Sequence, residues 1–405
     1  MITLQDALQR ARANVPQFLA ANTEAAIAHQ DRVQARAAIL PTLSYTTSYL
    51  YTQGNGTPSG VFIANNAVHE YIAQGNAHEA LSLGAGQIAE YRRASAAEAL
   101  ARAKVEIAAR GLVVTVVQIF YAYVVTQRKY ANAQLAATEA GRFLKISQDL
   151  ERGGEVAHSD VIKAQLQSND RQREVQEAHL AMDKARLTLA VLLFPNFNQD
   201  FSVVDDLRFA PPLPTMPEVM DMAKKNNPDL RAASAALQVT EREVQVARAA
   251  HFPSLTLDYW YGIDAAHFAT YMGPTRSLGY AAAATLNVPV WNWGAVQSKV
   301  KQASLRRKQA QVELNLAQRQ LLSNLQSFYR EAATARAELE ILRSSAELAA
   351  ESLRLTNLRY QAGEATALEA VDAQNTLVQA RNAYDDGEAR YRQALANLQT
   401  LTGSF

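Results

Sequence analysis

Apolar and small residues recur along the last third of the chain at alternating intervals of four and three positions. Thr356 alone interrupts the series, whose members are Leu321, Leu325, Phe328, Ala332, Ala335, Leu339, Leu342, Ala346, Ala349, Leu353 and Tyr360. A period of 3.5 residues is typical of coiled coils. The pattern therefore predicts a long helix over about 294–360, a tight turn at 361–364 and a return helix over about 364–401. At 1.5 Å per residue the first helix would be roughly 100 Å long.

A second pattern, with one face apolar at every other position, follows Pro41 and Pro253. The positions are Leu43, Tyr45, Thr47, Tyr49 and Tyr51 in the first stretch and Leu255, Leu257, Tyr259, Tyr261 and Ile263 in the second. Period-two alternation predicts strands. Weaker partner stretches extend these regions to about 42–85 and 254–290, so we expect two hairpins with loops at 54–58 and 272–274.

The Tyr-rich face of these hairpins needs a partner, because a lone hairpin is marginally stable. Strands of about ten residues with alternating faces and aromatic ends match the pattern of a membrane β-barrel. A soluble sheet packed on the helices explains the alternation equally well. The alternation alone therefore leaves both interpretations open.

The chain also contains an internal duplication. Pro41-Thr42-Leu43 is echoed 212 residues later by Pro253-Ser254-Leu255, and Gly154-Glu155 is echoed 209 residues later by Gly363-Glu364. Matches over this length with few gaps indicate one unit written twice. We expect a first structural repeat at 1–194, an equatorial linker at 195–215 and a second repeat at 216–405. In the first repeat the long helix spans about 86–152 and the return helix about 155–193.

Composition narrows the class of protein. The 405 residues carry a net charge of +1 and no Cys, which gives no sign of a nucleic-acid surface and excludes disulfides and thiolate metal sites. The most apolar run, 111–125, is shorter than the roughly 20 residues of a membrane-spanning helix, so we interpret it as buried coiled coil. The first residues open directly into a predicted helix, and we expect no signal peptide in this sequence, as a mature chain with its signal removed would also show.

The sequence predicts no enzyme. It contains no phosphate-binding Gly-x-x-x-x-Gly-Lys loop and no His-Glu-x-x-His zinc motif. Its seven His are dispersed. His158, two residues from Asp160, and His69 and His78, in or near the second strand with Glu79, are better explained as solvated polar residues than as metal ligands. We therefore expect no catalytic residue, no cofactor and no metal.

The order of these elements resembles the TolC family of bacterial outer-membrane efflux channels. The resemblance covers essentially the whole chain and depends on the junctions 40–43 and 252–255, on Val288-Pro289-Val290-Trp291-Asn292-Trp293-Gly294, and on the turn 359–364 with its continuation 368–373. It implies a mostly α-helical fold with a membrane β-barrel portion. Each protomer would supply long antiparallel coiled-coil helices and four strands, and three protomers would form a channel-tunnel made of an α-barrel and a β-barrel. The implied location is the outer membrane, with the helical part in the periplasm.

The resemblance also assigns roles to residues near the two turns. Asp160, Glu369 and Asp372 would form carboxylate rings at the closed periplasmic entrance, and Tyr360 resembles a tyrosine of the entrance latch. Glu369 and Asp372 share a helix face, and carboxylate rings favour cations. The family's arginine two residues after the turn glycine is replaced here by Ala365, so closure would depend on Tyr360, packing and the carboxylates.

The turns themselves are expected to contact a partner. Glycine permits the backbone reversal at both tips. By resemblance the periplasmic adaptor would dock there, on Arg152, Gly154, Glu155, Gly363 and Glu364.

These features predict the outer-membrane channel of a tripartite efflux system. It would be a homotrimer and a passive conduit for small molecules, with a periplasmic adaptor, an inner-membrane pump and outer-membrane lipid as partners and no nucleic acid. Alternatives are the outer-membrane component of type I protein secretion, the heavy-metal branch of the family, which the scattered His and Met do not support, and a soluble coiled-coil scaffold.

Overall fold

The computed structural model describes residues 1–52, 69–268, 270–272 and 275–403. The expected loop at 54–58 and part of the loop at 272–274 lie outside these residues. The chain divides into two compact units, one made of 1–22, 104–231 and 317–405 and the other of 23–103 and 232–316. The boundaries fall inside helices α2 (Pro16–Ala37), α3 (Gly86–Gly153), α6 (Pro228–Ala249) and α7 (Ala295–Gln361).

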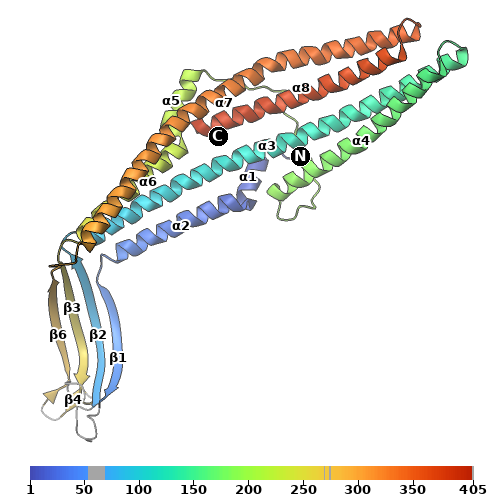
Figure 1. Ribbon diagram of the computed structural model, residues 1–405. Helices are drawn as coiled ribbons and strands as arrows, with labels where there is room; N and C mark the ends of the chain where they lie inside the picture. The colour runs from blue at the N-terminus through green and yellow to red at the C-terminus, as the bar shows by residue number, and fades with distance from the viewer. Residues whose placement is uncertain (53–68, 269, 273–274, 404–405) are drawn as a thin grey trace. The chain divides into compact units, whose positions relative to one another are not determined.

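The first unit is helical. Helix α3 reverses into α4 (His158–Leu193) and α7 reverses into α8 (Ala367–Thr402), so each long helix lies antiparallel to its return helix (Figure 1). The short helices α1 (Leu4–Asn14) and α5 (Met216–Asn226) complete the unit. The predicted coiled-coil seam of α7 is confirmed, because Leu325, Ala332 and Ala335 are at most 2% exposed.

The apolar run at 111–125 forms the centre of the main core of this unit. Val116 and Phe120 are fully buried against Leu189 of α4 and Leu207 of the segment 195–215. Helix α3 is long and apolar enough to span a membrane by length and composition, but 44% of its most apolar window is buried within the protein. The core packing explains why this helix is so apolar. It also shows that the segment 195–215 packs against the helices, with Val203 pairing in parallel with Ile2.

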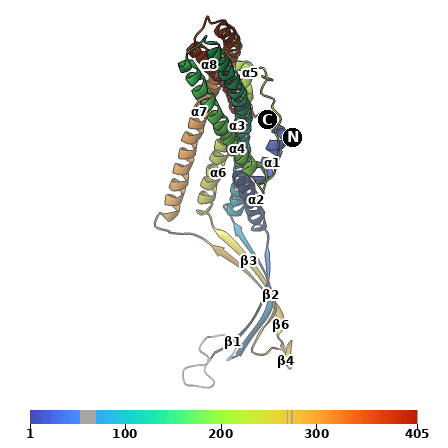
Figure 2. The ribbon, with the colours of Figure 1, turned by 90° about the vertical axis from the view of Figure 1, so that its right-hand side faces the viewer.

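The second unit contains a four-stranded antiparallel sheet in the order β1-β2-β3-β6 (Figure 1). Its strands are β1 (Thr42–Tyr51), β2 (His69–Ser82), β3 (Ser254–Ala265) and β6 (Leu278–Asn287). Strands β2 and β3 pair from Tyr71↔Ala265 to Ser82↔Ser254, so the two predicted hairpins join into one sheet. Figure 2 shows the twist of this sheet, and a separate short ladder joins β4 (Tyr271–Met272) to β5 (Thr275–Arg276).

The register gives the sheet two chemically different faces. One row across the strands reads Tyr45, Gly75, Tyr261 and Tyr280, and the next reads Ser44, Asn76, Trp260 and Ala281. The first face also carries Leu43 and Tyr259, whereas the second carries a hydrogen-bonding contact of 2.7 Å between Nδ1 of His78 and Oδ1 of Asp258. Leu43 and Tyr280 are 83% and 76% exposed, so the described residues do not cover the Tyr-rich face.

Side chains that cap the first turn determine where some of the helices begin. Asn227 caps α6 by accepting a hydrogen bond of 2.9 Å from the amide of Leu230, as the Asn-Pro pair predicts. The return helices α4 and α8 begin about three residues later than expected, at His158 and Ala367. For α8 the reason is Thr366, whose hydroxyl forms a capping box with Glu369.

Candidate functional site

The two turns that reverse the long helices have the same backbone geometry. Gly154 and Gly363 adopt left-handed φ angles of +77° and +75°. At each turn the amide after the glycine donates to a carbonyl five residues back, Glu155 to Leu150 at 2.9 Å and Glu364 to Arg359 at 2.8 Å. This closure satisfies carbonyls that a helix end otherwise leaves open. Both glycines are exposed and nothing lies within 4 Å of the position a Cβ would take.

Tyr360 lies in the last turn of α7 and is 3% exposed. Its ring packs on Phe143 of α3 with centroids 4.9 Å apart, and its hydroxyl is 3.0 Å from Oγ of buried Ser147. Ala164 of α4 and Ala367 of α8 complete the same cluster. Tyr360 therefore links the ends of all four long helices inside one chain.

The three predicted carboxylates occupy different settings near this cluster. Asp160 lies in the first turn of α4 and is 3.2 Å from Nζ of Lys163. Glu369 lies in the first turn of α8, where it accepts from the amide and hydroxyl of Thr366 at 3.2 and 3.1 Å. Asp372 is exposed one turn further along α8. The chain thus holds Glu369 in a fixed position and leaves Asp372 open to solvent.

Glu369 is also electrostatically tuned. The backbone amide of Thr366, then its hydroxyl, and then the charge of Arg359 hold the pKa of Glu369 below its ordinary value of 4.5. The guanidinium of Arg359 lies 3.5 Å from this carboxylate and also donates to the carbonyl of Glu364 at 3.0 Å. Arg359 therefore places a cation beside the turn, although the family's arginine position is occupied here by Ala365. The sequence analysis did not identify this role of Arg359.

The remaining predicted tip residues are exposed. Arg152 pairs with Asp149 one turn back on α3, and its side chain is 75% exposed. Glu155 and Glu364 project at the turns, where both are exposed. His158 pairs with Glu151 at 2.7 Å, so its partner is not the nearby Asp160. Each turn thus presents charged side chains and an exposed, uncrowded glycine to solvent.

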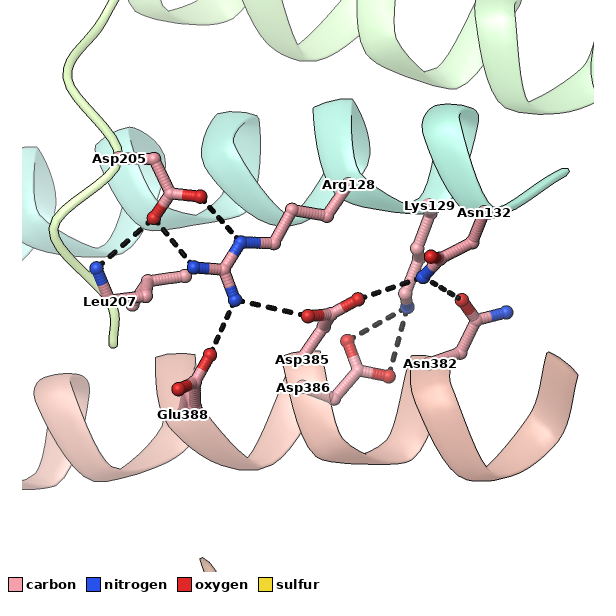
Figure 3. Close-up of polar contacts among 9 residues, drawn as sticks. All are labelled: Arg128, Lys129, Asn132, Asp205, Leu207, Asn382, Asp385, Asp386 and Glu388. Atoms are coloured by element: carbon pink, nitrogen blue, oxygen red, sulfur yellow. Dashed lines mark hydrogen bonds and ion pairs between the residues drawn. The ribbon is translucent and has the colours of Figure 1, made fainter. Parts of the chain in front are cut away.

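A second polar cluster was not expected from the sequence (Figure 3). Arg128 of α3 is bound by Asp205 through two hydrogen bonds of 2.5 and 2.7 Å, and by Asp385 of α8 at 3.0 Å and Glu388 of α8. The side chain of Arg128 is 15% exposed. One guanidinium therefore joins α3, α8 and the segment 195–215. The signal in the sequence was the concentration of acidic residues at 205–206 and 385–388, whose partner a linear pattern does not identify.

Burial and ion pairing shift the pKa values of the carboxylates in this cluster in opposite directions. Burial raises the pKa of Asp385 above its ordinary value of 3.8, despite the hydrogen bonds it receives from Arg128 and Asn132. Burial also acts to raise the pKa of Asp205, but hydrogen bonds from Arg128 and from the amide of Leu207 outweigh it and leave that pKa below its ordinary value. Among the described residues no group of three or more His, Asp or Glu side chains could hold a metal ion.

Comparisons with known proteins find similarity to outer-membrane efflux proteins in both sequence and structure. The family described as outer membrane efflux protein matches residues 219–404. The cobalt-zinc-cadmium resistance protein CzcC of Cupriavidus metallidurans is 23% identical over 80% of this chain and 75% of its own length. The outer membrane protein TolC of Vibrio cholerae is 24% identical over 98% of this chain and 89% of its own length. The crystal structure of the CmeC outer membrane channel of Campylobacter jejuni superimposes with a TM-score of 0.84 at 17% identity, covering 99% of this chain and 85% of that one.

Proposed function

Because this chain is a member of the TolC family of bacterial outer-membrane efflux proteins, we propose that it is the outer-membrane channel of a tripartite efflux system. It is a passive conduit that carries small molecules from an inner-membrane pump and a periplasmic adaptor to the cell exterior. The observation that carries the proposal is the sheet. One face is rich in Tyr and Leu, the other is polar, and both edge strands are open to further pairing.

The open edges support a homotrimer. Three copies of the four-stranded sheet would close a twelve-stranded barrel in which β6 of one copy pairs with β1 of the next. Closure removes edges that are costly in lipid. The Tyr-rich face then contacts lipid and the face with His78 and Asp258 lines the lumen.

The proposed protomer consists of two structural repeats, 1–194 and 216–405, joined by the segment 195–215. Similar local features at matching positions support this division. Thr3 and Thr215 both form capping boxes, with Asp6 and Glu218 respectively. The two helix-reversing turns also close with the same hydrogen bonds.

At the periplasmic entrance we assign cation selection to Asp160, Glu369 and Asp372. A threefold assembly would repeat each carboxylate three times around the pore, and such rings favour cations. Tyr360 would act on the entrance through packing, because its ring and hydroxyl are engaged within the chain. A change in the closed entrance that moves α7 relative to α3 must break its contact with Ser147.

The adaptor is proposed to dock on the two turns. Exposed charge at Arg152, Glu155 and Glu364 and the open backbone at Gly154 and Gly363 support this assignment. The glycines serve the turn in any case, so docking is an additional role.

The nature of the cargo depends on proteins other than this one. Relatives include the alkaline protease secretion protein AprF of Pseudomonas aeruginosa, 23% identical over 99% of this chain, and the metal-resistance protein CzcC. We favour small molecules over secreted protein and metal ions. A soluble coiled-coil scaffold is not favoured, because it leaves the uncovered Tyr-rich face without a function.

The test is electron microscopy of the full chain extracted in mild detergent. A threefold hollow particle with a detergent belt at one end is the expected result. A water-soluble particle without a belt would contradict the membrane barrel and the channel with it.

A further inference from the structure

The segment that follows the last strand of the sheet carries large apolar side chains that none of the residues described by the structure covers. Trp291 and Trp293 are 75% and 89% exposed, with their rings edge to face at 5.8 Å. Trp293 also has a left-handed φ of +53°, a conformation that disfavours side chains with a Cβ. A strained and exposed tryptophan indicates that the side chain has a partner outside the chain. Tryptophan is the residue most typical of the boundary between hydrocarbon and lipid headgroups.

The start of α7, immediately after these tryptophans, carries charged side chains of positive sign only. Between Ala295 and Val312 there are five cationic residues and no Asp or Glu: Lys299, Lys301, Arg306, Arg307 and Lys308. All five are exposed, and none forms an ion pair with a carboxylate in the part of the chain that the structure describes. Later in the same helix the pattern is different, since Arg343 pairs with Glu340 at 2.8 Å and Arg354 with Glu351 at 2.7 Å.

Three of these cations line a groove between α6 and α7. The groove has a volume of about 450 Å³, and Lys301, Arg307 and Lys308 share it with Leu237 and Leu305. Glu241 is its one carboxylate, so cations outnumber anions there three to one. A site with excess positive charge and apolar walls suits an amphiphilic anion, because arginine and lysine bind phosphate oxygens and leucine covers the adjoining carbon chain.

The order of features along the chain matches the layers of a membrane. The apolar face of β6 is followed by the tryptophans and then by the cations. Side chains on a helix lean toward its N-terminus, which in α7 is the end next to Trp293. At 1.5 Å per residue Lys299 and Lys301 lie roughly 10 Å along α7 from Trp293, so their long side chains can reach back toward the headgroup layer while their stems lie on the helix.

We propose that the segment 291–308, with the groove between α6 and α7, binds the headgroups of anionic phospholipids in preference to zwitterionic ones. The inference rests on the proposed membrane barrel and deepens it. The phosphate and the net negative charge of a lipid such as phosphatidylglycerol are recognised by Lys299 and Lys301, the two cations of the segment nearest Trp293. Trp291 and Trp293 fix the depth of the protein in the same leaflet.

The experiment uses full-length protein in mild detergent and counts bound lipid by native mass spectrometry. Short-chain phosphatidylglycerol is the probe and phosphatidylethanolamine with the same chains is the reference. The test variant replaces Lys299, Lys301, Arg306, Arg307 and Lys308 with Gln. The matched control makes the same loss of five charges at other exposed positions, namely Arg12, Lys145, Lys184, Lys224 and Arg330.

We expect wild-type protein and the control to prefer phosphatidylglycerol. In the test variant the ratio of bound phosphatidylglycerol to bound phosphatidylethanolamine should fall by about tenfold or more. The variant Lys301→Arg with Lys308→Arg should retain it, because the charge is kept. Equal binding of the two lipids by wild-type protein, or an unchanged preference in the test variant, would overturn the proposal. Loss of trimers in the test variant would also overturn it, because the cations would then serve contacts between copies.

The detergent belt seen by electron microscopy reports separately on the barrel. A belt without lipid preference contradicts this inference and leaves the channel standing. Absence of the belt contradicts the channel itself.

Discussion

At the scale of single residues, the hydroxyl of buried Tyr360 lies 3.0 Å from the hydroxyl of Ser147. We predict that Tyr360→Phe lowers the free energy of unfolding by about 1 kcal/mol, because the mutation leaves the serine hydroxyl buried and unpaired. Ser147→Ala should have a similar effect, because it leaves the hydroxyl of Tyr360 without this partner.

The double variant tests this contact. Since removal of both partners leaves no unpaired group, it should cost less than the sum of the single variants. Denaturant unfolding of the three variants gives the comparison. Additive losses would show that the two hydroxyls are not coupled.

The carboxylate of Glu369 permits a prediction about selectivity. Replacing Glu369 and Asp372 with Ala should reduce the cation preference of single channels by about a factor of five, the effect of about 1 kcal/mol for a unit charge at 4 Å in water. Unchanged selectivity in recordings of reversal potential would refute the carboxylate rings.

The pH dependence follows from the capping contacts. Because the pKa of Glu369 lies below its ordinary value of 4.5, its charge persists as the pH falls through 4.5 and is lost below that. We expect the Glu369-dependent part of the cation preference, measured in the Asp372→Ala background, to follow the same course. Thr366→Val removes the capping hydroxyl, so in that background it should shift the loss of preference to higher pH. A midpoint that does not move would show that Thr366 does not tune this carboxylate in the assembled channel.

At the scale of elements, the turn at Gly363 joins α7 to α8 with a left-handed residue that has no close neighbours. Gly363→Val forces a β-branched residue into that conformation, at a cost of about 1–2 kcal/mol. We expect impaired efflux in cells with trimers intact, because the distortion is confined to the proposed docking surface. Gly141→Ala, an exposed glycine within α3, is the control and should be neutral or slightly stabilising. Loss of trimers in Gly363→Val would show a role in folding and none in docking.

The polar cluster around Arg128 connects three elements (Figure 3). Arg128→Met removes the cation from Asp205, Asp385 and Glu388. It should cost on the order of 3 kcal/mol because two of these carboxylates, Asp385 and Glu388, are buried and lose their partner. Lys129→Met is the matched control. Its ion pair with Asp386 is more exposed, so its loss should be below about 1 kcal/mol.

Limited proteolysis gives a second readout for these variants. Cleavage within 195–215 should increase in Arg128→Met and stay unchanged in Lys129→Met, since Asp205 ties that segment to α3. Equal stability of the two variants would contradict the proposed anchoring role.

Elements with a strong local period could be predicted, and contacts between distant segments could not. The seam of α7 followed from its 3.5-residue period, because each position repeats the same geometry. The pairing of β2 with β3 brings Tyr71 beside Ala265, and no local pattern specifies a contact over that distance. The late start of α8 was readable in principle, since Thr366 and Glu369 have the spacing of a capping box. The partners of Arg128 come from two further segments, so the residue looked like any polar position on a helix.

At the scale of the whole molecule, similarity to TolC-family proteins over nearly the full chain supplies what the single chain does not show. The proposed barrel and trimer concern how copies of the chain combine, and the proposed adaptor and pump are other proteins. Electron microscopy and lipid counting therefore test the assembly, as do the Glu369 and Gly363 variants, whereas the Tyr360 and Arg128 variants test contacts within one chain.

The outer strands β1 and β6 each leave one row of backbone amides and carbonyls unpaired within the sheet that the structure describes. In hydrocarbon every such group costs several kcal/mol, so a single chain has no low-energy route into a bilayer. In water the same edges invite indiscriminate pairing. In the proposed trimer each chain would therefore have to meet two others before or while it enters the membrane. The rate at which channels form should therefore rise more steeply than in proportion to the concentration of unassembled chain. At a low rate of synthesis the unassembled chain should persist longer and be more exposed to proteolysis.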